Sequence, residues 1–114
     1  MSVPRGPLVT MIHTVPTVYA SFPALVRQAI PEVQLVNTVD EFLASDPGER
    51  GEFTVTNRSR FLRVLEAAQM TGAAAIVTTC STVSPEVELL RPLIECPIIT
   101  IDGAMLCEAV ALGE

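Results

Sequence analysis

The amino-acid sequence predicts an α/β fold with a parallel sheet. Three observations support this prediction: short apolar, β-branched runs recur along the chain, segments with helical spacing of apolar residues lie between them, and proline or glycine marks many boundaries. Strands that alternate with helices are typical of a parallel sheet with right-handed crossovers. Because the chain has 114 residues, we expect one domain spanning residues 1–114.

Four short runs are predicted to be strands. The second alternates and is β-branched, and the third is apolar on both faces, as a central strand of a parallel sheet should be. These runs lie at residues 8–12, 34–39, 73–79 and 97–101.

The segment after the first strand is predicted to be helical. Apolar residues recur at helical spacing between Val18 and Ala29. Proline suits a first helical turn better than a helix interior. We therefore expect a turn or short helix near Pro16, and the main helix from about Phe22, next to Pro23.

Further helices are expected between the later strands. A short helix is predicted at 40–44, and the turn-forming residues at 46–51 predict a loop. Asn57 is expected to cap a helix that runs to about Met70, with a solvated face of arginines at positions 58, 60 and 63.

The last two predicted helices follow the third and fourth strands. Ser84 offers a capping hydroxyl for a helix that Pro92 should break early. Asp102 is expected to cap a final helix, which would carry Cys107.

Composition disfavours several classes of partner. A net charge of −6 and an aromatic content of 4% argue against nucleic-acid binding. No apolar run approaches the roughly 20 residues that cross a bilayer, and the start of the chain does not resemble a signal peptide, so we expect a cytoplasmic protein. Charged residues make up only 18%. This shortage indicates an apolar surface covered by a second copy or a second lobe.

The cysteines and the histidine do not predict a metal or another cofactor. The spacing of Cys80, Cys96 and Cys107 fits neither a CxxC pair nor a zinc knuckle, and His13 is the only histidine. An odd number of cysteines argues against a disulfide framework.

The candidate site lies where the predicted strands end. Ligands of such sheets bind beyond the carboxyl ends of the strands, and Cys80 directly follows the third strand. Backbone N–H groups at the following helix start favour a thiolate and a substrate carboxylate, and Ser81 and Thr82 add hydroxyl donors. His13 and Thr14 end the first strand and should reach the same cleft.

Each of these residues also has a purely structural interpretation. Free cysteine often fills a core, which is the interpretation we favour for Cys96 and Cys107. A lone histidine such as His13 is more often a hydrogen-bonded structural residue. Asp40 can be a charged helix start, and Asp102 a helix cap.

The order of these features resembles the aspartate/glutamate racemase superfamily, which includes hydantoin racemases, maleate isomerases and arylmalonate decarboxylases. The stretches that carry the resemblance lie at residues 12–17 (IHTVPT), 39–41 (VDE), 72–82 (GAAAIVTTCST) and 97–105 (PIITIDGAM).

The resemblance implies a three-layer sandwich with a four-stranded parallel sheet in the order 2-1-3-4, as one lobe of a two-lobe fold. It also implies a cofactor-independent enzyme in which one cysteine of each lobe moves a proton at the carbon next to a carboxylate. Cys80 matches the first of these cysteines, Ser81 and Thr82 match the residues that hold the substrate carboxylate, and Thr14 matches a loop contact. The chain ends at Glu114, where the family begins its second lobe, so the carboxy-terminal lobe is expected to be absent.

Three functions follow as expectations. The first is an amino-acid racemase or related isomerase that acts on a small carboxylate. His13 and Thr14 stand where glutamate racemases carry an acidic residue and a serine, which favours a broader group than glutamate racemases. The second is a single-cysteine decarboxylase or maleate-type cis–trans isomerase, and the third is a non-catalytic interaction module.

Overall fold

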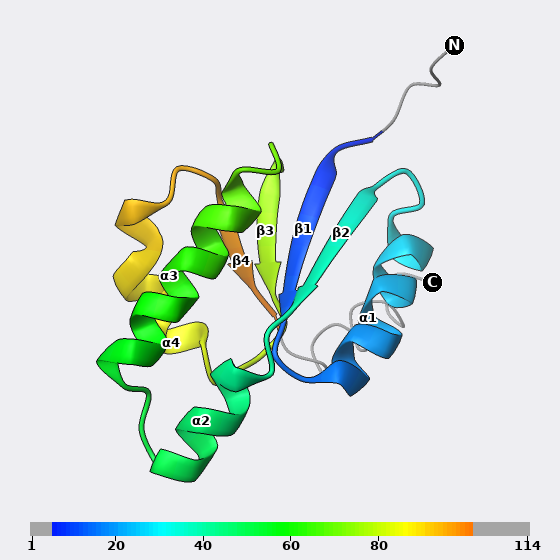
Figure 1. Ribbon diagram of the computed structural model, residues 1–114. Helices are drawn as coiled ribbons and strands as arrows, with labels where there is room; N and C mark the ends of the chain where they lie inside the picture. The colour runs from blue at the N-terminus through cyan, green and yellow to red at the C-terminus, as the bar shows by residue number, and fades with distance from the viewer. Residues whose placement is uncertain (1–5, 102–114) are drawn as a thin grey trace.

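A four-stranded parallel sheet forms the centre of the protein (Figure 1). The computed structural model describes residues 6–101, with the backbone alone at 17–19. The strands are β1 (Leu8–His13), β2 (Gln34–Val39), β3 (Ala75–Thr78) and β4 (Ile98–Thr100), in the order β2-β1-β3-β4. The predicted α/β class, the parallel pairing and the strand order are confirmed.

Helices cover both faces of the sheet. They are α1 (Pro16–Ala29), α2 (Phe42–Arg50), α3 (Val55–Gln69) and α4 (Ser84–Leu90), followed by the 3₁₀ turn η1 (Arg91–Leu93). Helix α1 packs on β1 and β2, whereas α3 and α4 lie on the opposite face and contact β1, β3 and β4 (Figure 1). This arrangement is compatible with the predicted three-layer sandwich.

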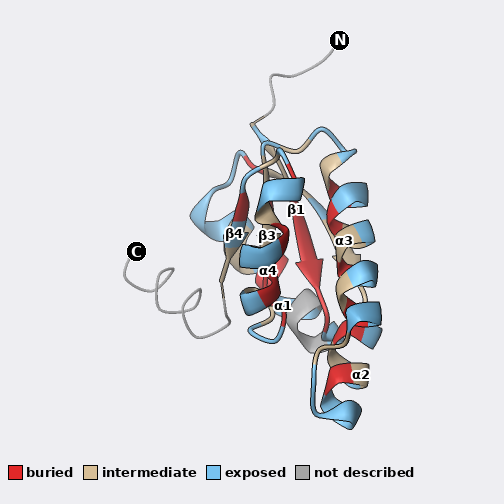
Figure 2. Ribbon diagram, turned by 90° about the vertical axis from the view of Figure 1, so that its left-hand side faces the viewer, coloured by how far each residue is buried: buried red, intermediate tan, exposed pale blue. Residues whose placement is uncertain are grey.

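The main core lies between the sheet and the α3/α4 layer. Alternate strand residues point to one face, so Ile12, Ile76 and Ile98 together form the floor of this core. Phe61 and Leu65 of α3 pack on it and are fully buried. Figure 2 shows buried stretches on β1 and on α3. Burial of several large side chains between two layers holds the helices on the sheet.

Helix α1 differs from the prediction because it is continuous. It begins at Pro16 and passes through Pro23 without a break. A proline inside a helix removes one N–H bond. Here Pro23 is buried beside Phe22, and apolar burial offsets that loss. No helix in the described range 6–101 is both long enough and apolar enough to span a bilayer.

The loop predicted at 46–51 is wrong, because residues 42–50 form α2. Pro47 is buried inside this helix, and Arg50 Nε lies 2.9 Å from the Asp46 carboxylate one turn earlier. Gly51 then ends the helix with a φ of 76°, a conformation that glycine adopts without strain. Tertiary burial of Leu43 and Pro47 therefore overrides the local turn signals.

The predicted caps are also corrected. Thr54, not Asn57, occupies the N-cap of α3. Position 83 precedes α4, and the Ser84 hydroxyl donates to the Cys80 carbonyl oxygen (3.4 Å) instead of capping the helix. The early end of α4 before Pro92 is confirmed. The predicted helix at Asp102 and the position of Cys107 lie outside the described residues.

Arg60 and Arg63 of α3 are exposed, as predicted, but two arginines of this helix also pair with carboxylates of neighbouring elements. The Arg58 Nε donates to the Glu86 carboxylate on α4 (2.5 Å), which raises the pKa of Arg58. The Arg60 Nε donates to the Asp40 carboxylate (2.9 Å), and its guanidinium lies 4.9 Å from the centre of the Phe42 ring. These contacts attach α3 to neighbouring elements instead of leaving it as a free charged face.

Candidate functional site

The carboxyl ends of the parallel strands meet at one edge of the sheet, where they converge near the centre of Figure 1. Ile12 of β1 pairs with Thr78 of β3, so the residues that follow leave adjacent strands at the same level. Thr14 follows β1 and Cys80 follows β3. The structure therefore brings the predicted site residues of these two strands to the same edge.

Cys80 carries a free, half-buried thiol at this edge. Its side chain packs against the core cluster, and its carbonyl oxygen accepts the Val83 N–H (3.3 Å) in the turn that leads into α4. The residue thus has core contacts on one side and a tight turn on the other. Ser81 and Thr82, which follow in that turn, are exposed.

Two buried hydroxyls near this edge lack a partner among the described residues. Thr14 is 2% exposed and Thr78 is 0% exposed, and no hydrogen bond reaches the Oγ1 atom of either. A buried polar atom without a partner costs about 1–3 kcal/mol. Such an atom needs an explanation, and a bound oxygen from water or a ligand is one that fits a strand-end edge.

His13 is fully buried and bonded through both ring nitrogens. Its Nε2 lies 2.9 Å from Oδ1 of Asn37, and its Nδ1 lies 2.9 Å from Oγ1 of Thr79. Because an amide oxygen only accepts, Nε2 carries the proton and donates, and Nδ1 accepts the Thr79 hydroxyl proton. The ring thereby links the central strands to β2.

The environment of His13 favours its neutral form. Burial lowers the pKa of His13, and the hydrogen bond with Asn37 opposes that change only partly. A neutral ring with both nitrogens held by protein groups fits the structural interpretation of this residue. It positions Thr79, the residue directly before Cys80.

An open hollow of about 400 Å³ lies beside the turn that follows Cys80. Thr82 lines one side, and the segment that joins α2 to α3 lines the other through Gly51, Glu52 and Phe53. Residues of α2 complete the wall. Thr82 is thus a predicted site residue that also faces a hollow.

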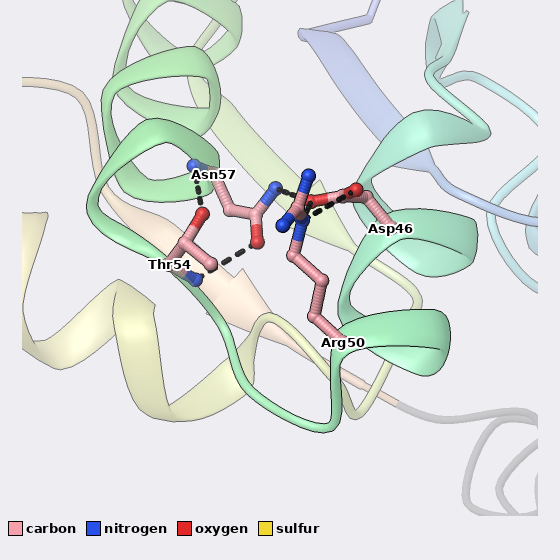
Figure 3. A network of polar contacts seen from close by, with 4 residues as sticks. All are labelled: Asp46, Arg50, Thr54 and Asn57. Atoms are coloured by element: carbon pink, nitrogen blue, oxygen red, sulfur yellow. Dashed lines mark hydrogen bonds and ion pairs between the residues drawn. The ribbon is translucent and has the colours of Figure 1, made fainter.

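A network of polar contacts fixes the wall of this hollow (Figure 3). The Asn57 side-chain amide donates to Oδ2 of Asp46 (3.0 Å), and Arg50 donates to the same carboxylate (2.9 Å). The bond from Asn57 is the main reason that the pKa of Asp46 is lowered. Thr54 and Asn57 also exchange hydrogen bonds between side chain and backbone, at 2.8 and 3.1 Å.

This network holds both ends of the segment 51–53, which makes the wall a defined surface (Figure 3). The sequence analysis missed it. The spacing of a threonine and an asparagine three residues apart, at positions 54 and 57, is the signal that could have predicted this capping box.

Two further polar residues lie outside the hollow beside Thr82, although Asp40 also follows a strand at this edge. Asp40 lines a second hollow of about 420 Å³ between β2 and α3, where Arg60 pairs with it. Cys96 precedes β4 at the opposite end of the sheet, as predicted, and burial raises the pKa of its thiol. In the part of the chain that the structure describes, no three His, Cys, Asp or Glu residues gather as a metal-binding group.

Comparisons with family models, curated proteins and solved structures find no match. The resemblance to the racemase superfamily therefore rests on the stretches quoted from the sequence.

Proposed function

We propose that the protein is one lobe of a cofactor-independent racemase or related isomerase that acts at the carbon next to a small carboxylate. The observation that carries this proposal is the position of Cys80. Its half-buried thiol lies two residues beyond the end of β3, on the edge where Thr14 leaves β1. Strand-end edges of parallel sheets are where such folds bind ligands.

The thiol and the hydroxyls have different roles in the proposed reaction. A thiolate at Cys80 takes the proton from the carbon next to the carboxylate, and the negative charge moves onto the carboxylate oxygens. Hydroxyl donors at Ser81 and Thr82 hold these oxygens and stabilise the added charge. The unpartnered Thr14 hydroxyl is a third donor for the same group.

Inversion at carbon needs a second proton donor on the opposite face of the substrate. Cys96 lies at the other end of the sheet and donates its thiol proton to the Ala73 carbonyl oxygen (3.3 Å), so it does not serve. We assign the second donor to another lobe or to a second copy of the chain.

A second candidate function needs only one thiol. Within residues 6–101, Cys80 is the one cysteine at the strand-end edge. One thiol suffices to protonate a carbanion after loss of carbon dioxide, or to add reversibly to a double bond. Decarboxylase or cis–trans isomerase activity would therefore show turnover of malonates or maleate without exchange of an α-proton.

Exchange of the α-proton with solvent tests the proposal. Amino acids and hydroxy acids are incubated with the protein in D₂O, and deuterium incorporation is followed by NMR. Cys80→Ser should slow exchange by about 100-fold or more, since a positioned acid or base contributes that much. Cys96→Ser is the matched control and should leave the rate unchanged. Equal exchange by the parent and Cys80→Ser would contradict the proposal.

A further inference from the structure

We infer that the hollow beside Thr82 selects an α-amino acid with an apolar side chain and a single carboxylate. This inference rests on the proposed function, because it takes Cys80 as the reacting thiol. Cys80 and Thr82 are two residues apart, so their Cα atoms are at most about 7 Å apart. A substrate held at this turn by its carboxylate lies next to the hollow.

The lining of the hollow is mainly apolar. Pro47 and Phe53 contribute carbon surface, and Phe53 is held by an edge-to-face contact with Phe61 at 6.4 Å between ring centres. Gly48 and Gly51 line the hollow without a side chain that would fill it. An apolar side chain that enters the hollow therefore gains burial without a steric barrier.

Positive charge is missing from the lining. None of the described residues that surround the hollow is basic. The arginines closest along the chain are already paired, Arg50 with Asp46 at 2.9 Å and Arg58 with Glu86. A second substrate carboxylate would lose water here without gaining a cationic partner, which is unfavourable.

The charged group that does line the hollow is Glu52, which is exposed. Its carboxylate repels a second carboxylate and attracts an ammonium group. Together with the apolar wall, this favours an amino acid such as phenylalanine or leucine. The same charge disfavours aspartate, glutamate, maleate and malonates.

Binding is measured first, by ¹⁵N NMR of the full chain titrated with phenylalanine and, separately, with glutamate. We expect phenylalanine to shift the amide signals of Gly48, Gly51, Phe53 and Thr82, and glutamate to leave them in place. Equal or larger shifts with glutamate, or no shifts at these residues with either probe, would overturn the inference.

Reversing the charge at Glu52 tests its role in the selectivity directly. Glu52→Arg should weaken phenylalanine binding by about three- to fivefold, as expected for an exposed ion pair, and should create binding of glutamate. Glu49→Arg is the matched control, because Glu49 is an exposed carboxylate on α2 that does not line the hollow. If both variants change the preference equally, the hollow is not the origin of the selectivity and the inference fails.

The two proposals fail in different ways. If phenylalanine shifts the amide signals of the hollow but keeps its α-proton in D₂O, the result supports the selective hollow and contradicts the proposed reaction. Exchange of the glutamate α-proton that depends on Cys80, with phenylalanine unreactive, supports the reaction and overturns the selectivity.

Discussion

Two polar regions of this molecule differ in how far their hydrogen bonds are satisfied. Between α2 and α3, the side chains of Asp46, Thr54 and Asn57 all bond to protein partners (Figure 3). At the strand-end edge, the buried hydroxyls of Thr14 and Thr78 have no partner among the described residues. The first region therefore acts as a structural clamp, and the second is open to a bound oxygen.

The largest expected effect of a substitution concerns the clamp. Asn57→Ala removes a buried amide that bonds to both Thr54 and Asp46. We expect the free energy of unfolding to fall by about 3 kcal/mol, because the Thr54 N–H loses its acceptor in the capping box and the Asp46 carboxylate loses a donor. Chemical denaturation measures this. Ser59→Ala, at an exposed position of the same helix, should change stability very little, and a similar loss in both variants would contradict the account.

The next effect concerns His13. Both of its ring nitrogens have hydrogen-bond partners, but burial disfavours the protonated form of the ring. Its pKa in the folded protein lies below the usual 6.5, so the unfolded chain binds a proton first as the pH falls. Stability should therefore decrease below about pH 6.5, by at most about 1.4 kcal/mol per pH unit, until the folded-state pKa is reached.

Denaturation at a series of pH values measures that slope. His13→Gln cannot take up the proton and should lose the dependence that begins below about pH 6.5, whatever its overall stability. The lowered pKa of Asp46 acts in a separate range, below its usual value of 3.8, where acid should weaken the clamp. An unchanged slope in His13→Gln would show that another group titrates.

The smallest expected effect distinguishes two buried threonines, Thr10 in β1 and Thr14 just after it. The Thr10 hydroxyl lies 2.9 Å from the Thr71 hydroxyl, whereas the Thr14 hydroxyl is unpartnered. Thr10→Val should lower the free energy of unfolding by about 1 kcal/mol, and Thr14→Val should raise it by a similar amount. Losses of equal size would contradict the distinction, because they would mean that Thr14 is satisfied too.

The strands were predictable because their signals are local. The predicted ranges 8–12 and 34–39 match β1 and β2 within one residue, since buried parallel strands need continuous apolar or β-branched runs. The same logic placed Cys80 directly beyond β3.

The wall of the hollow could not be predicted in the same way. Pro47 and Gly48 are strong turn signals, but the burial of Pro47 and Leu43 and the bonds made by Asp46 keep this segment helical. These contacts come from residues that are distant in the chain or on another helix. The position of Glu52 on the hollow, where its carboxylate repels a second carboxylate, depends on that packing and has no signature in the sequence.

The most direct test of the central claim is the alkylation rate of each cysteine, mapped by mass spectrometry with and without a bound amino acid. The account predicts that Cys80 reacts faster than Cys96, whose thiol pKa is raised by burial, and that phenylalanine slows the reaction at Cys80 alone. If Cys80 reacts no faster than Cys96, the strand-end edge is not a working thiol site and the proposed function is wrong. If Cys80 reacts faster but phenylalanine does not protect it, the selectivity of the hollow is wrong.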